Sequence, residues 1–410
     1  MSKMETATDI TEVNDGSIIT PIGFKAAGVY SKVKKKRRDL GVIYCDVPAS
    51  AAAVYTLNKI QAAPLQVSKE SIETEGKLRA IVVNSGNANS CTGKQGLADA
   101  YEMRNTAAET FEVPDHHVAV ASTGIIGEKL NMEKIVPGIQ SLQPQSDFED
   151  ADQFNEAILT TDIVKKHTCY ETTIDNKKVT FGGTAKGSGM INPNMATMLS
   201  FVTTDAAIEP EHLQTALSQV TNKTFNRITI DGDTSTNDMA VVMASGLAEN
   251  DSLTPSHPEW NKFVKALEMA CEDLSKKIAR DGEGATKLIE VNVKGAATDE
   301  EAGKAAKQIV GSDLVKTAVF GTDANWGRII CALGYSEISL DPDTIDIAVG
   351  PVVTLKDSTP VDFSETEAKA YLEQDTIVID VNLNMGTGTG KAWGCDLTYD
   401  YVRINAGYRS

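Results

Sequence analysis

The sequence of 410 residues contains little that would support disulfide, zinc-thiolate or membrane chemistry. Its six cysteines lie far apart, with no C-x-x-C pair and no cysteine–histidine cluster at the spacing of a zinc site. Free and mostly buried thiols in a reducing compartment are the simplest interpretation. No apolar run approaches the length of a transmembrane helix, and residues 1–15 lack an apolar signal core. We therefore expect a cytoplasmic protein that does not bind a membrane.

Positive charge is also scarce. Lysine and arginine number 39 against 57 aspartate and glutamate, a formal net charge of -18. Because a general binder of phosphate backbones needs a positive surface, we expect no nucleic-acid partner. One basic run, Lys34 to Arg38, opposes this trend, and we interpret it as a solvated surface loop. The alternatives are a nucleic-acid patch or a targeting signal.

Short apolar runs bounded by Gly, Asn and Asp recur along the chain and predict strands. The expected strands are 41–45, 80–83, 118–121, 178–181, 228–230, 240–243, 288–293, 316–320 and 376–381. Helices are predicted over 99–111, 209–221 and, most clearly, 260–278, which carries one apolar stripe. Residues 298–307 and 341–344 are interpreted as connecting or surface segments. Because the alternation lacks a steady βαβ rhythm, it indicates an α+β or layered α/β enzyme.

Two segments resemble ligand-binding loops. The segment from Met385 to Lys391 fails the spacing of both a Walker A loop and a dinucleotide fingerprint, since Met385 stands where glycine is needed and Ala392 follows the lysine. We interpret it as a flexible turn, with close approach to a ligand as a further option. The segment from Asn84 to Ser90 offers backbone N–H groups and amides that suit an oxyanion, and a plain loop is an equal alternative.

The segment from Ala185 to Val202 carries the residues with the clearest chemistry. Its first half is a Gly- and Pro-containing turn, and its second half, from Met198, resembles a strand. Thr197 therefore stands where backbone strain can be held by rigid surroundings. Its hydroxyl can attack the carbonyl of Ala196, giving an ester that water splits. The new terminus would pair a hydroxyl nucleophile with an α-amino group of pKa about 7.7 to 8.0, which suits a general base.

This segment resembles the autocleavage site of the ornithine acetyltransferase family, the bifunctional glutamate N-acetyltransferases of arginine biosynthesis. In that family the bond before the threonine of Met-Ala-Thr-Met-Leu is cut, which here is Ala196–Thr197. Further matching segments span nearly the whole chain, at 38–43, 55–63, 83–90, 122–127, 231–238, 280–287 and 321–327. The resemblance implies an α+β layered sandwich, helices packed around β-sheets, of the self-cleaved N-terminal-nucleophile type of the ornithine acetyltransferase/aminopeptidase superfamily.

The resemblance also implies how the chain is organised after cleavage. An α chain of residues 1–196 and a β chain of residues 197–410 would form one intertwined unit, associated as α2β2. The implied enzyme is an acyltransferase that moves the acetyl group of N-acetyl-L-ornithine to L-glutamate through acetyl-Thr197. The products are L-ornithine and N-acetyl-L-glutamate. No metal or organic cofactor is implied, and the use of acetyl-CoA as a co-substrate stays open.

Residue roles follow from the same resemblance. Thr123 and Gly124 correspond to the oxyanion hole, with a strand-end turn as the structural alternative. The substrate-contacting positions are Thr160, Thr161, Lys186, Thr197, Glu283, Asn405 and Ser410. The nearest alternative function is a self-cleaving N-terminal-nucleophile amidase or aminopeptidase, which would pass the acyl group to water. A different class of alternative is an amino-acid-binding protein that never cleaves itself.

Overall fold

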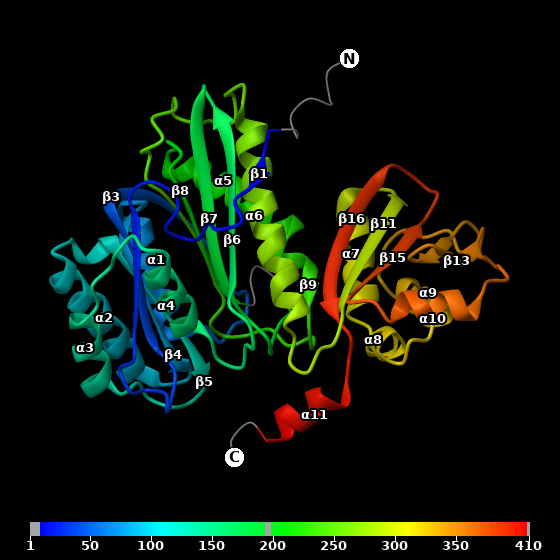
Figure 1. The fold of residues 1–410 in the computed structure, drawn as a ribbon, viewed down its shortest axis with the longest axis horizontal. Helices are drawn as coiled ribbons and strands as arrows, with labels where there is room; N and C mark the ends of the chain where they lie inside the picture. Colours follow the sequence, from blue (N-terminus) through cyan, green and yellow to red (C-terminus); the bar gives the residue numbers. More distant parts are fainter. Residues whose placement is uncertain (1–8, 193–197, 408–410) are drawn as a thin grey trace. The chain divides into compact units, whose positions relative to one another are not determined.

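The computed structural model describes residues 9–192 and 198–407. Ala196, Thr197 and Ser410 therefore lie outside the described residues. The chain divides into two compact units, coloured by sequence in Figure 1. The first comprises Met1–Gly187, Asn194–Asn222 and Thr234–Leu274, and the second comprises Ser188–Pro193, Lys223–Asp233 and Ser275–Ser410. Each unit takes segments from both sides of residue 196.

The first unit is built on a nine-stranded mixed sheet with the order β1-β6-β7-β8-β10-β3-β4-β5, and β2 pairs with β3. These strands are β1 (Thr11–Glu12), β2 (Phe24–Val29), β3 (Leu40–Tyr55), β4 (Lys77–Asn87), β5 (Val118–Ile125), β6 (Lys166–Ile174), β7 (Lys177–Lys186), β8 (Leu199–Thr204) and β10 (Met239–Ala244). Strand β8 is antiparallel to β7 and parallel to β10. The two strands that follow residue 196, β8 and β10, therefore lie side by side, with strands from before residue 196 on each side of the pair.

Helices cover both faces of this sheet. They are α1 (Ala63–Glu75), α2 (Gly93–Phe111), α3 (Met132–Gln140), α4 (Phe148–Ile158), α5 (Pro210–Lys223) and α6 (Trp260–Arg280), with a 3-10 turn η1 (Asp115–His117). Figure 1 shows α2 and α3 on one side of β3 to β5 and α4 on the other. Val82 packs in the core with α2 and α3, whereas Ile81 packs with Phe154 of α4. Successive strand residues thus enter opposite cores, as the period of two requires.

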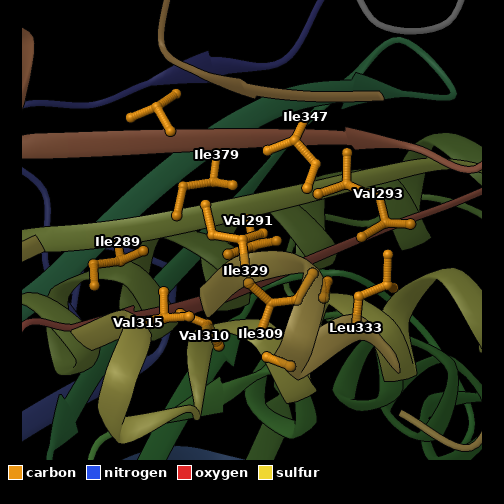
Figure 2. Packing of buried hydrophobic residues seen from close by; sticks show 14 of the residues in the cluster. Ile289, Val291, Val293, Ile309, Val310, Val315, Ile329, Leu333, Ile347 and Ile379 are labelled. Carbon is orange, nitrogen blue, oxygen red and sulfur yellow. The ribbon is translucent and has the colours of Figure 1, made fainter. Parts of the chain in front are cut away.

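The second unit contains a seven-stranded sheet with the order β14-β13-β12-β15-β11-β16-β9. Its elements are a 3-10 turn η2 (Phe225–Arg227), β9 (Ile228–Thr229), β11 (Leu288–Ala296), α7 (Asp299–Val310), α8 (Asp313–Phe320), α9 (Trp326–Gly334), β12 (Asp346–Val349), β13 (Val352–Lys356), β14 (Thr359–Pro360), α10 (Glu365–Leu372), β15 (Thr376–Asn382), β16 (Gly388–Cys395) and α11 (Tyr399–Ala406). Figure 2 shows Ile289 and Val291 of β11 facing Ile309 of α7 and Ile329 of α9. Strands of this sheet and the four helices α7, α8, α9 and α10 contribute buried residues to this core.

The predicted arrangement of helices around β-sheets is confirmed, and most expected elements are present. Two of the assigned segments are helices instead. Residues 316–320 were predicted as a strand but belong to helix α8, and residues 298–307 were interpreted as a surface segment but lie in helix α7. Thr298 caps α7 by accepting a hydrogen bond from the Glu301 N–H, and acidic residues fill the first turn. These capping signals start a helix that the short apolar pattern did not reveal.

The glycine-rich segment after Met385 was predicted as a flexible turn. From Gly388 onward it is instead strand β16. A Cβ atom on Gly390 would lie 2.3 Å from the backbone nitrogen of Gly303 in α7, and one on Gly388 would lie 2.3 Å from the carbonyl carbon of Thr298. The expected close approach of the backbone to another group is present, but the other group is helix α7 and its N-cap residue, not a ligand. The glycines therefore permit tight helix–strand packing.

All six cysteines are free, and four of them are buried, as the spacing predicted. In residues 9–192 and 198–407, no helix is both long and apolar enough to cross a membrane.

The close packing of α7 on β16 predicts that Gly390→Ala destabilises the protein. The added methyl group would overlap the Gly303 backbone, and overpacking of this kind costs about 1–3 kcal/mol. The free energy of unfolding, measured by urea denaturation, checks this. The matched control is Gly334→Ala in α9, where a new Cβ would meet no atom within 4 Å. Equal stabilities of the two variants would contradict the packing argument.

Candidate active site

Thr123 and Gly124 lie near the end of β5, within the strand. The parallel register with β4 places Thr123 beside Ser85 and Gly124 beside Gly86. Gly124 has φ 129°, and a Cβ atom there would lie 2.3 Å from the carbonyl carbon and oxygen of Gly86. Only glycine fits this position without strain, because an L side chain would clash with the neighbouring strand. The backbone N–H of Gly124 is therefore held in a conformation that a side chain would not allow.

Asn237 braces this end of the sheet. Its side-chain amide donates hydrogen bonds to the carbonyl oxygens of Ser122 and Ala88. The two carbonyls belong to β5 and to the segment that follows β4. One buried side chain thus fixes the backbone on both sides of the Thr123–Gly124 pair. Asn237 belongs to segment 231–238, one of the segments that resemble the family, so the sequence marked it as a residue of interest. The sequence did not indicate that Asn237 would bind the carbonyl groups of Ser122 and Ala88.

In the asparagine-rich segment from Asn84 to Ser90, the side-chain amides form hydrogen bonds with other groups of the protein. Asn84 donates to the carbonyl oxygen of Asn87 at 3.0 Å, and Asn89 donates to the carbonyl oxygen of Gly96 at 2.8 Å. Asn87 donates to the Glu128 carboxylate at 3.1 Å. These contacts favour the structural interpretation of the segment over an anion-binding one.

Asp162 organises the second group of predicted residues. Its side chain is fully buried, and Oδ1 accepts hydrogen bonds from Lys166 Nζ and from the Gly187 N–H, both at 2.7 Å. Oδ2 accepts from the Thr160 N–H at 3.0 Å, and the Thr160 hydroxyl lies 3.5 Å away. The segment after α4 is thereby tied to the start of β6 and the end of β7.

The electrostatics of Asp162 link it to Lys186. Burial by itself raises the pKa of a carboxyl group, but the charges of Lys186 and Lys166, with the hydrogen bonds, hold the pKa of Asp162 far below its usual range. Asp162 is therefore ionised at neutral pH. Lys186 is itself buried at the end of β7. The structure thus brings Thr160 and Lys186 together around the Asp162 carboxylate. Thr160 and Thr161 are both partly exposed.

No role for Asp162 was predicted from the sequence.

The basic run from Lys34 to Arg38 was interpreted as a solvated loop, which is wrong for part of it. Lys34 Nζ donates to the carbonyl oxygen of Leu159 at 2.9 Å, and Arg37 Nη1 donates to that of Asp162 at 3.4 Å. Arg38 bonds the carboxylate of Glu156 at 2.6 Å. Burial lowers the pKa of Lys34 to about 8. The run supports the segment that carries the Thr160–Asp162 turn.

Glu283 and Asn405 form the predicted pair of the second unit. Asn405 Nδ2, on α11, donates to Glu283 Oε2 at 2.8 Å, and Glu283 is 7 % exposed. The Glu283 N–H donates to the carbonyl oxygen of Ser188 at 2.9 Å. Gly189 lies against the Glu283 carboxylate, since a Cβ on this glycine would come within 2.5 Å of it. Two residues that are 122 positions apart thus meet beside the segment that leads toward residue 196.

Asp231 fixes that segment. Its carboxylate accepts hydrogen bonds from the N–H groups of Met190 at 2.6 Å and Ile191 at 2.8 Å. The Ile230 N–H in turn donates to the carbonyl oxygen of Ile191 at 2.7 Å. On the other side of residue 196, the Met198 carbonyl oxygen accepts from the Met239 N–H at 2.9 Å. The described residues that flank positions 193–197 are therefore held by specific backbone contacts.

The role of Asp162 predicts that Asp162→Asn destabilises the protein. The change removes the negative charge that Lys166 and Lys186 share, and breaking a buried ion pair costs about 3–5 kcal/mol. Since the folded-state pKa is depressed, this stabilisation is present above about pH 4 and is lost as the pH falls further. Unfolding measured at pH 7 and in acid should show the difference between wild type and variant shrinking in acid.

The control for Asp162 is Asp152→Asn. Asp152 pairs with Lys165 at the surface, where both side chains are more than a third exposed, so we expect a loss below about 1 kcal/mol. A pH-independent effect of Asp162→Asn would contradict the ionised state assigned to Asp162.

Comparison with known proteins relates this arrangement to a family. The chain matches the model of the ArgJ family over residues 25–410. The arginine biosynthesis bifunctional protein ArgJ of Halalkalibacterium halodurans is 67% identical over 411 residues, and that of Geobacillus kaustophilus is 62% identical over 410 residues. Each alignment covers 100% of both chains.

A solved structure gives a second comparison. The crystal structure of arginine biosynthesis bifunctional protein ArgJ from Bacillus halodurans is 74% identical, with a TM-score of 0.51. The match covers 52% of this chain and 100% of the crystallised one. The resemblance drawn from the sequence segments is confirmed by the match over nearly the full length, and the chain belongs to the ArgJ family.

Proposed function

We propose that this protein is an acyltransferase of arginine biosynthesis that moves the acetyl group of N-acetyl-L-ornithine to L-glutamate. The single observation that carries the proposal is the full-length identity of 67% with an arginine biosynthesis bifunctional protein. At this identity, with no end of either chain left unmatched, the fold and the order of the functional segments are shared. The products are L-ornithine and N-acetyl-L-glutamate.

The first step is self-cleavage between Ala196 and Thr197. The Thr197 hydroxyl attacks the Ala196 carbonyl, the peptide bond becomes an ester, and water hydrolyses the ester. This step is supported by the hydrogen bonds of the described residues nearest to the bond, since Asp231 anchors Met190 and Ile191, and the Met239 N–H binds the Met198 carbonyl oxygen. The β chain would have 410 − 196 = 214 residues, or 52% of the chain, which equals the share of this chain that the crystallised ArgJ chain matches.

The fragments would stay together as an intertwined unit. Strand β8 begins at Leu199 and is hydrogen-bonded to β7 on one side and β10 on the other, and all six of its residues are buried. Cleavage at residue 196 removes none of these contacts. We further propose an α2β2 assembly in the cytoplasm, and six free cysteines support a reducing compartment.

Acetyl transfer follows by double displacement. Thr197 attacks the acetyl carbonyl of N-acetylornithine, with its own α-amino group as general base, and ornithine leaves with the proton. Thr123 and Gly124 stabilise the oxyanion through a hydroxyl and a backbone N–H. The positive φ of Gly124 and the brace from Asn237 support this role, because donors act best when they are already fixed. Glutamate then attacks acetyl-Thr197 and carries the acetyl group away.

Both substrates are amino acids, so the site needs groups for a carboxylate and for an ammonium. Lys186 suits the carboxylate and Glu283 the ammonium. Thr160, Thr161, Asn405 and Ser410 would complete the substrate contacts. Asp162 supports Thr160 and Lys186, and Asn405 orients the Glu283 carboxylate.

Acetyl-CoA is a further acetyl donor in this proposal, supported by the word bifunctional in the names of both relatives. Neither route calls for a resident metal or organic cofactor.

Self-cleavage predicts two fragments that meet between Ala196 and Thr197. Intact mass measured under denaturing conditions should show them for the wild type and show one uncut chain for Thr197→Ala. Thr197→Ser keeps a hydroxyl and should still be cut. Under native conditions the fragments should co-elute, since β8 keeps its partners. A single uncut wild-type chain would remove the basis of the mechanism and favour the binding-protein alternative.

The transfer step predicts that ornithine release from N-acetylornithine depends on glutamate and yields N-acetylglutamate. Thr123→Val should lower kcat by about 100-fold or more, because one oxyanion donor is lost. Thr172→Val is the matched control, since Thr172 is buried in β6 and its hydroxyl has no hydrogen-bond partner among the described residues. Mass spectrometry of ornithine and N-acetylglutamate measures the rate of transfer for the wild type and for each variant. Release of free acetate at a rate that glutamate does not change would favour the hydrolase alternative.

A further inference from the structure

A cluster of possible metal ligands lies at the end of β5 that is remote from Thr123. Within residues 9–192 and 198–407, one group of at least three histidine, cysteine or acidic side chains is close enough to hold an ion, namely Glu75, His116 and His117. Glu75 is the last residue of α1, and the two histidines form the turn η1 that leads into β5. Their ligand atoms all lie within 4.8 Å of one another. Sequence spacing did not reveal this group because Glu75 is distant in the chain.

The distances suit a transition metal. His117 Nε2 lies 3.0 Å from Glu75 Oε2, and His116 Nε2 lies 3.3 Å from Glu75 Oε1. In a tetrahedral zinc site with metal–ligand bonds of about 2.0–2.1 Å, neighbouring ligand atoms are about 3.3 Å apart. The two imidazole rings are at 73° to each other, with both Nε2 atoms directed at one carboxylate. Each histidine nitrogen thus lies at about the ligand–ligand spacing of such a site from one oxygen of the Glu75 carboxylate.

The surroundings support His116 as a ligand. Asp115 Oδ1 lies 3.4 Å from His116 Nδ1, on the side of the ring away from Glu75. Arg104 holds the other oxygen of Asp115 at 3.2 Å. Metal-bound histidines commonly give their second ring nitrogen to a carboxylate in this way. His116 Nε2 is buried, and no hydrogen bond to it is formed by the described residues, despite its nearness to Glu75. This nitrogen is suitably placed to bind a cation.

We propose that Glu75, His116 and His117 bind a divalent transition-metal ion of the zinc type, with water as the fourth ligand. Two imidazoles and one carboxylate match the ligands that zinc takes, whereas magnesium and calcium prefer oxygen alone. The ion joins the C-terminal end of α1 to the turn that begins β5. Its role is structural and independent of acetyl transfer, because Thr123 and Gly124 lie at the other end of that strand.

Calorimetric titration of the full-length protein with zinc chloride tests the proposal. Exposed thiols also bind zinc, so the titration uses a Cys91→Ser/Cys331→Ser background. We expect one ion per chain and binding at least about 10-fold weaker in Glu75→Gln and in His116→Gln. His257→Gln is the matched control, since His257 pairs with Asp175 at 3.2 Å outside the cluster, and it should bind zinc as the parent does.

Thermal melting supplies an independent readout. At free zinc about 100-fold above the dissociation constant, the melting temperature should rise by about 5 °C, and magnesium should have no effect. Glu75 is exposed and His116 is partly so, and the melting curves of the metal-free variants report whether they fold. Should they not fold, the visible absorption of cobalt(II) bound to the Cys91→Ser/Cys331→Ser protein tests for tetrahedral nitrogen and oxygen ligation.

The absence of saturable zinc binding would overturn the proposal, as would binding that neither ligand substitution weakens. In either case the cluster is an ordinary histidine–carboxylate ion pair.

Discussion

The placement of β8 in the middle of its sheet is the constraint on which the rest of the arrangement depends. Its six buried residues pair with β7 on one side and β10 on the other. The strand starts at Leu199, two residues after Thr197, so the whole of β8 lies on the C-terminal side of the proposed cleavage. The backbone hydrogen bonds of β8 are satisfied by strands from both sides of residue 196. A break there removes a covalent link without removing the contacts that hold the fold.

Two carboxylates, Asp162 and Asp231, anchor the backbone of the segment that follows β7. Asp162 binds the N–H of Gly187 at the end of β7, and Asp231 binds the N–H groups of Met190 and Ile191. A charged acceptor that receives several hydrogen bonds is a strong and directional anchor. Both residues act on the backbone of the segment that runs toward positions 193–197. Of the two side chains proposed to contact substrates, Lys186 interacts with Asp162, and the Glu283 N–H binds the carbonyl oxygen of Ser188 in the same segment.

The glycines and asparagines of the two segments that resembled ligand-binding loops, and Gly124, make contacts within the protein itself. Gly124 allows two parallel strands to approach at a positive φ, and Gly390 allows helix α7 to lie directly on β16. The asparagines at 84, 87 and 89 bond to groups of the protein itself. From residue type alone, the segment from Met385 was interpreted as a flexible turn, and the segment from Asn84 to Ser90 was open to either an anion-binding loop or a plain loop. Glycine's lack of a side chain and asparagine's amide would both suit ligand binding. Here they serve close packing and internal hydrogen bonds instead.

The sequence by itself determined the nature of the chemistry and most of the elements. The hydroxyl at Thr197 and the ordered segments that match the family are local features of the chain, and so are the apolar periods that predicted helix 260–278 and most strands. Only the tertiary structure decided which distant residues meet. Asp162 with Lys166 and Gly187, Glu283 with Asn405, and Glu75 with the two histidines are contacts that no local pattern encodes. The physical reason is that a side chain's partner depends on strand order and helix placement, which are fixed by packing over the whole unit.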